Sequence, residues 1–142
     1  MTVAYFDSSA LVKLVIDEPG SDDVALLWDG ADAVITSRVA NPEVRAVLAA
    51  AHRDRRLDDE GHLAAKAEWS AFHQALRLVE LTPQLETDAG ELAERHALSG
   101  CDAIHLASAL TLIELPIIVA TWDARLLGAA RSVGLNSLPA QL

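Results

Sequence analysis

VAYFDSSALV (residues 3–12) contains the pattern from which the fold can be predicted. Val3–Phe6 is a short β-prone run that ends at Asp7. After it, the spacing typical of an amphipathic helix is found at Ser8, Leu11, Val12 and Val15. The stretch therefore predicts a strand, a tight turn and a helix, as at the start of an α/β unit.

The same alternation continues along the rest of the chain. Apolar runs predict further strands over 33–36, 78–81 and 117–120, and an edge strand over 135–138. Helical patterns occupy the intervals, at 22–28, 44–51, 65–76, 82–98, 102–110 and 126–133. This order implies one α/β domain over 1–142, with a mainly parallel central sheet flanked by helices. Ile117–Ala120, unbroken and apolar, is the predicted central strand.

The composition excludes several classes of protein. With 51% hydrophobic and 23% charged residues, the chain fits a soluble globular domain and not a disordered or collagen-like one. Its longest uncharged stretch, Ala103–Ile113, is shorter than the ~18 apolar residues that indicate a membrane-spanning helix. No basic leader precedes the first strand, so we expect a cytoplasmic protein without membrane association. The single cysteine, Cys101, excludes an internal disulfide and is expected to be a small core residue.

The net charge of −10 is opposite to that of a typical nucleic-acid-binding domain. A polyanionic substrate would therefore need a divalent cation held by carboxylates, or a local cluster of arginines. The sequence offers such a basic patch at Arg38, Arg45 and Arg125.

Acidic side chains occur at two kinds of position in the predicted fold. Asp7 and Asp123 follow the first strand and the strand over 117–120, where ligands bind in open α/β sheets. Glu43 and Asp102 lie near the N-terminal ends of helices, beside apolar stripes. Together they could form an oxygen-rich site suited to Mg²⁺ or Mn²⁺. The alternative is structural, because a carboxylate at a helix N-terminus commonly caps the helix or interacts with its dipole.

Four motifs occur in a recognisable order: FDSSAL (6–11), PEVRAVL (42–48), GCDAIHLASAL (100–110) and ATWDARLL (120–127). In this order and spacing the chain resembles the PIN-domain nucleases, specifically the small toxins of VapBC toxin–antitoxin pairs. The resemblance covers almost the whole chain, although residues 57–80 contribute little to it. It implies a PIN-like domain that cuts RNA with one or two divalent ions.

The resemblance also implies roles for particular residues and partners. Asp7, Glu43, Asp102 and Asp123 match the family's four acids, which are both catalytic and metal-binding. Ser9 and Thr121 match hydroxyl positions that support them. A cognate antitoxin and a homodimer are usual in the family.

Pro42 leaves two alternatives for the orientation of Glu43. If the helix begins at Ser37, Pro42 lies inside it, removes a backbone hydrogen bond and bends the axis. If Asn41 is instead the N-cap, Pro42 takes the favoured first helical position.

His105 follows Asp102 by one helical turn, and we interpret it as a hydrogen-bonded structural residue outside the catalytic set. The remaining histidines show no metal-ligand spacing and are expected at the surface: His52, His62, His73 and His96. The three tryptophans are expected to anchor the core or an interface: Trp28, Trp69 and Trp122.

The favoured chemistry is metal-assisted hydrolysis of RNA by water, without a covalent intermediate. Phosphoryl transfer to Asp7, as in receiver domains, would need a lysine after the last strand, and the lysines are Lys13 and Lys66. A catalytically silent binding module that acts through a protein partner is the alternative from another class.

Overall fold

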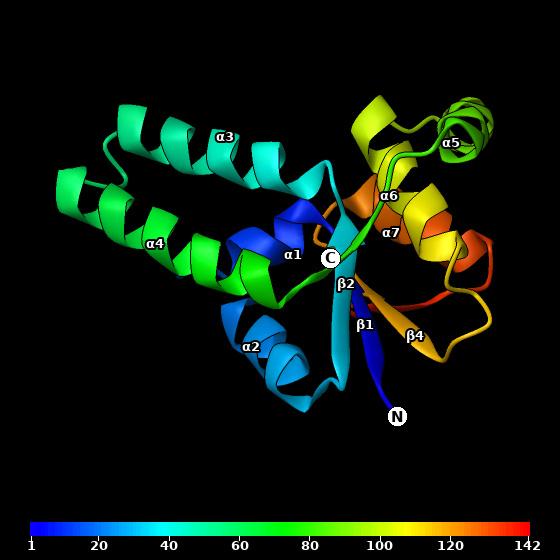
Figure 1. The fold of residues 1–142 in the computed structure, drawn as a ribbon, viewed down its shortest axis with the longest axis horizontal. Helices are drawn as coiled ribbons and strands as arrows, with labels where there is room; N and C mark the ends of the chain where they lie inside the picture. Colours follow the sequence, from blue (N-terminus) through cyan, green and yellow to red (C-terminus); the bar gives the residue numbers. More distant parts are fainter.

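A five-stranded sheet forms the centre of the computed structural model, which describes residues 1–142 (Figure 1). The strands are β1 (Val3–Phe6), β2 (Ala33–Ser37), β3 (Arg77–Val79), β4 (Ile117–Ala120) and β5 (Asn136–Leu138). All neighbouring pairs are parallel, in the order β3-β2-β1-β4-β5. The parallel sheet is confirmed, and β4 is an interior strand that pairs with both β1 and β5, although β1 and not β4 is the middle strand of the five. An apolar run indicates burial on both faces of a sheet and does not fix the place of a strand in it.

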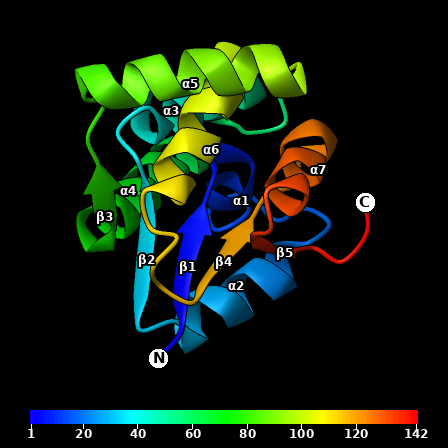
Figure 2. The same cartoon turned by 90° about the vertical axis from the view of Figure 1, so that its right-hand side faces the viewer.

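Seven helices cover the two faces of this sheet. They are α1 (Ser8–Val12), α2 (Ser21–Gly30), α3 (Ala40–Arg53), α4 (Asp59–Ala75), α5 (Pro83–His96), α6 (Gly100–Leu110) and α7 (Ala124–Ser132). Helices α1 to α4 share one hydrophobic core with the sheet, and α5 to α7 share another (Figure 2). None of the helices is both long and apolar enough to cross a membrane.

The central strand contributes side chains to both cores. Val3 and Tyr5 pack with α5 to α7, whereas Ala4 and Phe6 pack with α1 to α4. All four are buried, because successive side chains of a strand point to opposite faces and both faces are covered. The strand therefore delivers Asp7 directly from the middle of the sheet to its carboxyl edge.

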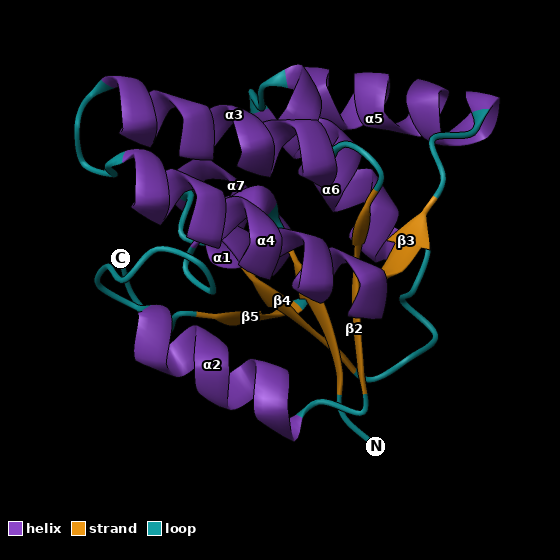
Figure 3. Cartoon of the chain, turned by 60° about the vertical axis from the view of Figure 1, so that its left-hand side comes forward, coloured by secondary structure: helices purple, strands orange, loops and turns teal.

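Several helix ends follow the local signals in the sequence. Thr82 caps α5 by accepting a hydrogen bond from the Leu85 N–H (3.2 Å), and Pro83 is the first helical residue, as predicted. The charged segment 53–60 contains the end of α3 and the turn into α4, also as predicted (Figure 3). In Figure 1 the α3–α4 pair extends well beyond the sheet.

Two predicted elements have different boundaries. Helix α1 ends before Val15, because the following residues form tight turns in which an N–H bonds the carbonyl three residues earlier. Strand β3 ends at Val79 instead of continuing to residue 81. Its partner strand β2 ends at Ser37, which pairs with Val79. Residues 80 and 81 therefore have no strand residues opposite them.

Cys101 is more exposed than predicted, and Val47, within the apolar pattern over 44–51, is also exposed. Cys101 is exposed in the first turn of α6, so the expectation of a core residue was wrong. Val47 is 38% exposed, because the buried stripe of α3 passes through Val44 and Leu48 and leaves Val47 at its edge.

The tryptophans anchor the α1–α4 core, as expected. Trp69 is 2% exposed, and its Nε1–H donates to the Asn41 side chain (2.9 Å). Trp28 and Trp122 pack half-buried against the same core.

Candidate active site

Asp7 lies at the carboxyl end of β1 and is 2% exposed. Its Oδ1 accepts hydrogen bonds from the Ala10 N–H (3.0 Å) and the Ser9 hydroxyl (2.7 Å), so that Asp7 caps α1. Its Oδ2 accepts from the Thr121 hydroxyl (2.6 Å). Burial raises the pKa of Asp7, whereas the nearby His105 and these hydrogen bonds lower it.

Thr121 connects Asp7 to the second acid of the sheet edge. The Thr121 Oγ1 donates to Asp7 and accepts from the Asp123 N–H (3.1 Å). Asp123 in turn caps α7, its Oδ1 accepting from the Leu126 N–H (2.9 Å). Ser9 adds a second link between the strand ends, because its hydroxyl accepts from the backbone N–H after Thr121 (2.8 Å). The supporting roles predicted for Ser9 and Thr121 are consistent with this network.

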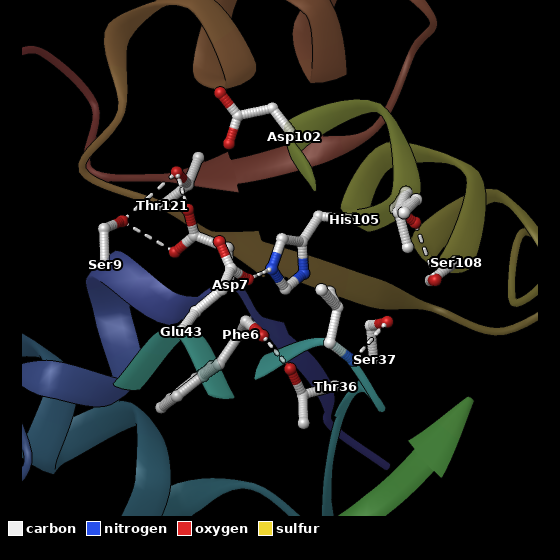
Figure 4. A network of polar contacts seen from close by, with 12 residues as sticks. Phe6, Asp7, Ser9, Thr36, Ser37, Glu43, Asp102, His105, Ser108 and Thr121 are labelled. Carbon is white, nitrogen blue, oxygen red and sulfur yellow. Dashed lines mark hydrogen bonds and ion pairs between the residues drawn. The ribbon is translucent and has the colours of Figure 1, made fainter. Parts of the chain in front are cut away.

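Asp102 approaches the same place from the first turn of α6. In Figure 4 its carboxylate points toward Thr121 and Asp7. Partial burial raises the pKa of Asp102, and the negative charges of Asp123 and Asp7 raise it further. Asp102 therefore lies close enough to acids of two other elements to be affected by their charges, which a helix-capping role alone does not require.

Glu43 belongs to the first turn of α3, which begins at Ala40. Neither predicted alternative for Pro42 holds, because it is the third residue of this helix. The first four N–H groups of a helix have no intrahelical partner, so the proline removes no hydrogen bond. Asn41 is not the cap, and its side chain instead accepts from Trp69.

The Glu43 carboxylate is held by His105, whose Nε2 lies 2.7 Å from Glu43 Oε1 (Figure 4). His105 is 1% exposed, and its Nδ1 lies 2.8 Å from the Tyr5 hydroxyl. The expectation that His105 is hydrogen-bonded is confirmed, but its bond to Glu43 was not foreseen. The available signal was its spacing of one helical turn from Asp102.

The predicted basic patch is partly occupied by contacts within the chain. The Arg38 guanidinium makes a bidentate ion pair with Glu80 (shortest distance 2.6 Å), which raises the pKa of Arg38. Arg125 donates to the Ala97 carbonyl (3.3 Å). Arg45 is exposed on α3.

The remaining histidines lie away from these acids. His52 pairs with Asp59 (2.8 Å) and stacks on His62, with 4.4 Å between ring centroids. These four histidines were expected at the surface, and each is partly buried.

The donor chemistry of the site fits a hydrated divalent cation. No three Asp, Glu, His or Cys side chains lie close enough to coordinate one ion together. Mg²⁺, however, keeps several waters and needs only one or two carboxylates. Asp7 Oδ2 accepts only one hydrogen bond, and the Asp102 carboxylate accepts none, so both retain free lone pairs.

Fold and site together define a parallel α/β domain with carboxylates gathered at the carboxyl edge of its sheet. The pattern of the PIN domain family matches residues 4–131, and the chain belongs to this family.

Individual relatives agree with this assignment. The chain is 49% identical to ribonuclease VapC49 from Mycobacterium tuberculosis, over all 142 residues and 99% of that protein. It is 35% identical to ribonuclease VapC46 from the same organism, over 95% of each chain. Two solved structures share the fold. M. tuberculosis VapC20 is 22% identical with a TM-score of 0.65, and the match covers 93% of this chain and 95% of that one. Rickettsia felis VapBC2 is 12% identical with a TM-score of 0.63, and the match covers 95% of this chain and 96% of that one.

Proposed function

We propose that the chain is a divalent-metal-dependent endoribonuclease, the toxin of a type II toxin–antitoxin pair acting in the cytoplasm. The observation that best supports this is the meeting of three acids at one edge of the sheet, where Thr121 links Asp7 to Asp123 and the carboxylate of Asp102 points toward them (Figure 4). The whole-length similarity to proteins named ribonucleases supports RNA as the substrate.

One or two of Asp7, Asp102 and Asp123 would bind Mg²⁺ or Mn²⁺ directly, and the other acids, with Glu43 beside them, would act through the waters that the ion keeps. Such an ion lowers the pKa of a bound water and neutralises charge on the phosphate. The protein's own contribution is to hold the carboxylates in fixed directions. Thr121 and Ser9 fix the Asp7 carboxylate, and the cap on α7 fixes Asp123. Asp102 accepts no hydrogen bond and stays free for a ligand.

Cleavage of a labelled RNA by the purified chain tests this proposal. We expect cleavage in Mg²⁺ or Mn²⁺, none in chelator, and a loss of at least ~10-fold in Asp102→Asn. Glu94→Gln removes one exposed carboxylate from α5 and serves as the matched control. If wild type and Asp102→Asn cleave equally, the active-site assignment is wrong.

A catalytically silent binding module remains the alternative, and one observation favours it: Asp7 and Asp123 do cap helices. In that case purified wild-type protein cleaves no RNA under any metal condition and still binds its protein partner.

A cognate antitoxin is the proposed protein partner. A groove of about 420 Å³ between the end of α1, α2 and α4 is lined by Leu14, Trp28, Glu68, Ala71, Phe72 and Ala75. Its neighbouring rim is acidic, with Asp17, Asp22 and Asp29. This combination fits an antitoxin segment with apolar and basic side chains, and the VapBC2 structure is a toxin–antitoxin complex of the same fold.

Growth of an expressing cell tests the toxin role. Wild-type chain expressed alone should arrest growth, Asp7→Asn should not, and co-expressed antitoxin should restore growth. Ala71→Glu adds charge to the exposed groove and should keep toxicity while losing this protection. Equal growth with wild type and Asp7→Asn would contradict the toxin role.

A homodimer is also proposed, on the basis of family resemblance. Light scattering of the purified chain should give twice the monomer mass of 15.2 kDa. A monomer mass at all concentrations would contradict it.

A further inference from the structure

A chain of hydrogen bonds runs from the central strand to the acidic site. The Tyr5 hydroxyl lies 2.8 Å from His105 Nδ1. His105 Nε2 lies 2.7 Å from Glu43 Oε1 (Figure 4). Tyr5 and His105 are almost completely buried, whereas the Glu43 side chain is 23% exposed. Only the last member of the chain therefore reaches the site where RNA would bind.

We propose that His105, held by Tyr5, is a positioning residue that fixes the Glu43 carboxylate for RNA cleavage. The proposal rests on the proposed ribonuclease function. His105 acts through Glu43 and not on the substrate, because its side chain is fully covered.

The direction of each hydrogen bond follows from the chemistry of its ends. An ionised carboxylate can only accept, so His105 Nε2 carries a proton and donates it to Glu43. In the neutral ring Nδ1 is then an acceptor, and the Tyr5 hydroxyl donates to it. A tyrosine hydroxyl is protonated near neutral pH, so it can donate this hydrogen bond. An edge-to-face contact, with 5.9 Å between ring centroids, also restrains the imidazole.

Glu43 needs this restraint more than the other acids do. Its carboxylate accepts no hydrogen bond other than the one from His105, and α3 has no side-chain cap. A glutamate without such contacts samples several rotamers. Helix α6 thus has two functions one turn apart, because Asp102 faces the site and His105 orients an acid of another helix.

Nitrogen NMR of the histidine rings in the metal-free protein tests the hydrogen bonds without RNA or activity. We expect the His105 Nε2 to be protonated, with a resonance that shifts in Glu43→Gln. A His105 ring protonated only at Nδ1 would overturn the proposal.

Kinetics test the function of the same contacts. His105→Phe keeps an aromatic ring but removes both hydrogen bonds, and should slow cleavage by about 10- to 100-fold. His105→Gln, whose amide can still donate to Glu43, should recover part of the rate. The His105→Phe/Glu43→Gln double variant should be no slower than Glu43→Gln alone, because both changes act on one group. Multiplicative losses would overturn the proposal.

Two further variants separate positioning from stability. Val119→Ala removes methyl groups from the same buried core and should lower the melting temperature without slowing cleavage. If His105→Phe does not fold, Tyr5→Phe replaces it, with a smaller expected loss of rate. Wild-type protein that cleaves no RNA would contradict the proposed function, while the NMR result would still decide the hydrogen bonds.

Discussion

Asp7 and Asp123 lie where strands β1 and β4 end, and backbone N–H groups and hydroxyls hold their carboxylates. Glu43 and Asp102 instead extend from the first turns of α3 and α6, where one accepts a single hydrogen bond and the other none. We call the first pair, with Ser9 and Thr121, the anchored half of the site. The second pair is the helix-borne half.

The difference shows that a carboxylate can be a helix cap and a site residue at the same time. In the anchored half the cap fixes the direction of the carboxylate and leaves other lone pairs free. In the helix-borne half the acids are less constrained and need not contribute to stability. Removing a supporting hydroxyl from the anchored half should therefore lower stability, whereas replacing an acid of the helix-borne half by its amide should lower activity alone.

Asp7→Asn should have the largest effect, a loss of cleavage of at least ~100-fold. The amide removes the central negative charge, and its NH₂ group cannot accept the Thr121 hydrogen bond. Labelled RNA in Mg²⁺ or Mn²⁺ gives the rate, and circular dichroism checks that the fold is retained. A residual rate above about one tenth of wild type, or a loss below ~1.4 kcal/mol, would contradict the assignment.

Asp102→Asn should lower activity without lowering stability. Burial and the charges of Asp123 and Asp7 disfavour its carboxylate in the folded protein, so the amide should melt at or above wild type in chelator. Thermal melting beside the cleavage assay measures both effects. A clearly lower melting temperature would remove the distinction between the two halves.

Thr121→Val tests the link inside the anchored half. The isosteric change leaves Asp7 Oδ2 and the Asp123 N–H without their partner, and should cost about 1–3 kcal/mol of unfolding free energy. Urea denaturation measures this, and Thr121→Ser, which keeps the hydroxyl, is the control. Equal stability of the valine and serine variants would show that the link contributes nothing.

The smallest effect should be the response of melting to metal. For an assumed dissociation constant near ~1 mM, ~10 mM Mg²⁺ stabilises the folded protein by about 1.4 kcal/mol, a shift of a few degrees. Asp123→Asn should melt at or above wild type in chelator and gain less from the ion. If Mg²⁺ and Mn²⁺ leave wild type unchanged, or the variant responds as strongly, Asp123 is only a helix cap.

The anchored half was the more predictable from sequence. A buried strand followed at once by an acid and a helix pattern, as at Val3–Ser8, fixes the location of Asp7 within a residue or two. Asp123 follows its strand in a similar way. The parallel α/β class was predictable for the same reason, because strands and helices differ in the period of their apolar residues.

The helix-borne half and the strand order depend on packing between distant segments. Nothing near Glu43 indicates that a histidine 62 residues later holds it. The exposure of Cys101 depends on which side of α6 meets α5 and the sheet, and a single residue in the first turn does not reveal this. The local periodicity of apolar residues predicts single helices and strands, whereas the packing of the whole core determines which of them lie side by side.

The hydrogen bond between Thr121 and Asp7 joins residues 114 positions apart, and β1 lies between β2 and β4. Contacts over such a separation form only when the late segment is available. When the chain has been synthesised only as far as β3, it contains Asp7 and Glu43 but not Asp102, Thr121 or Asp123. The four acids therefore cannot come together until synthesis of the chain is nearly complete.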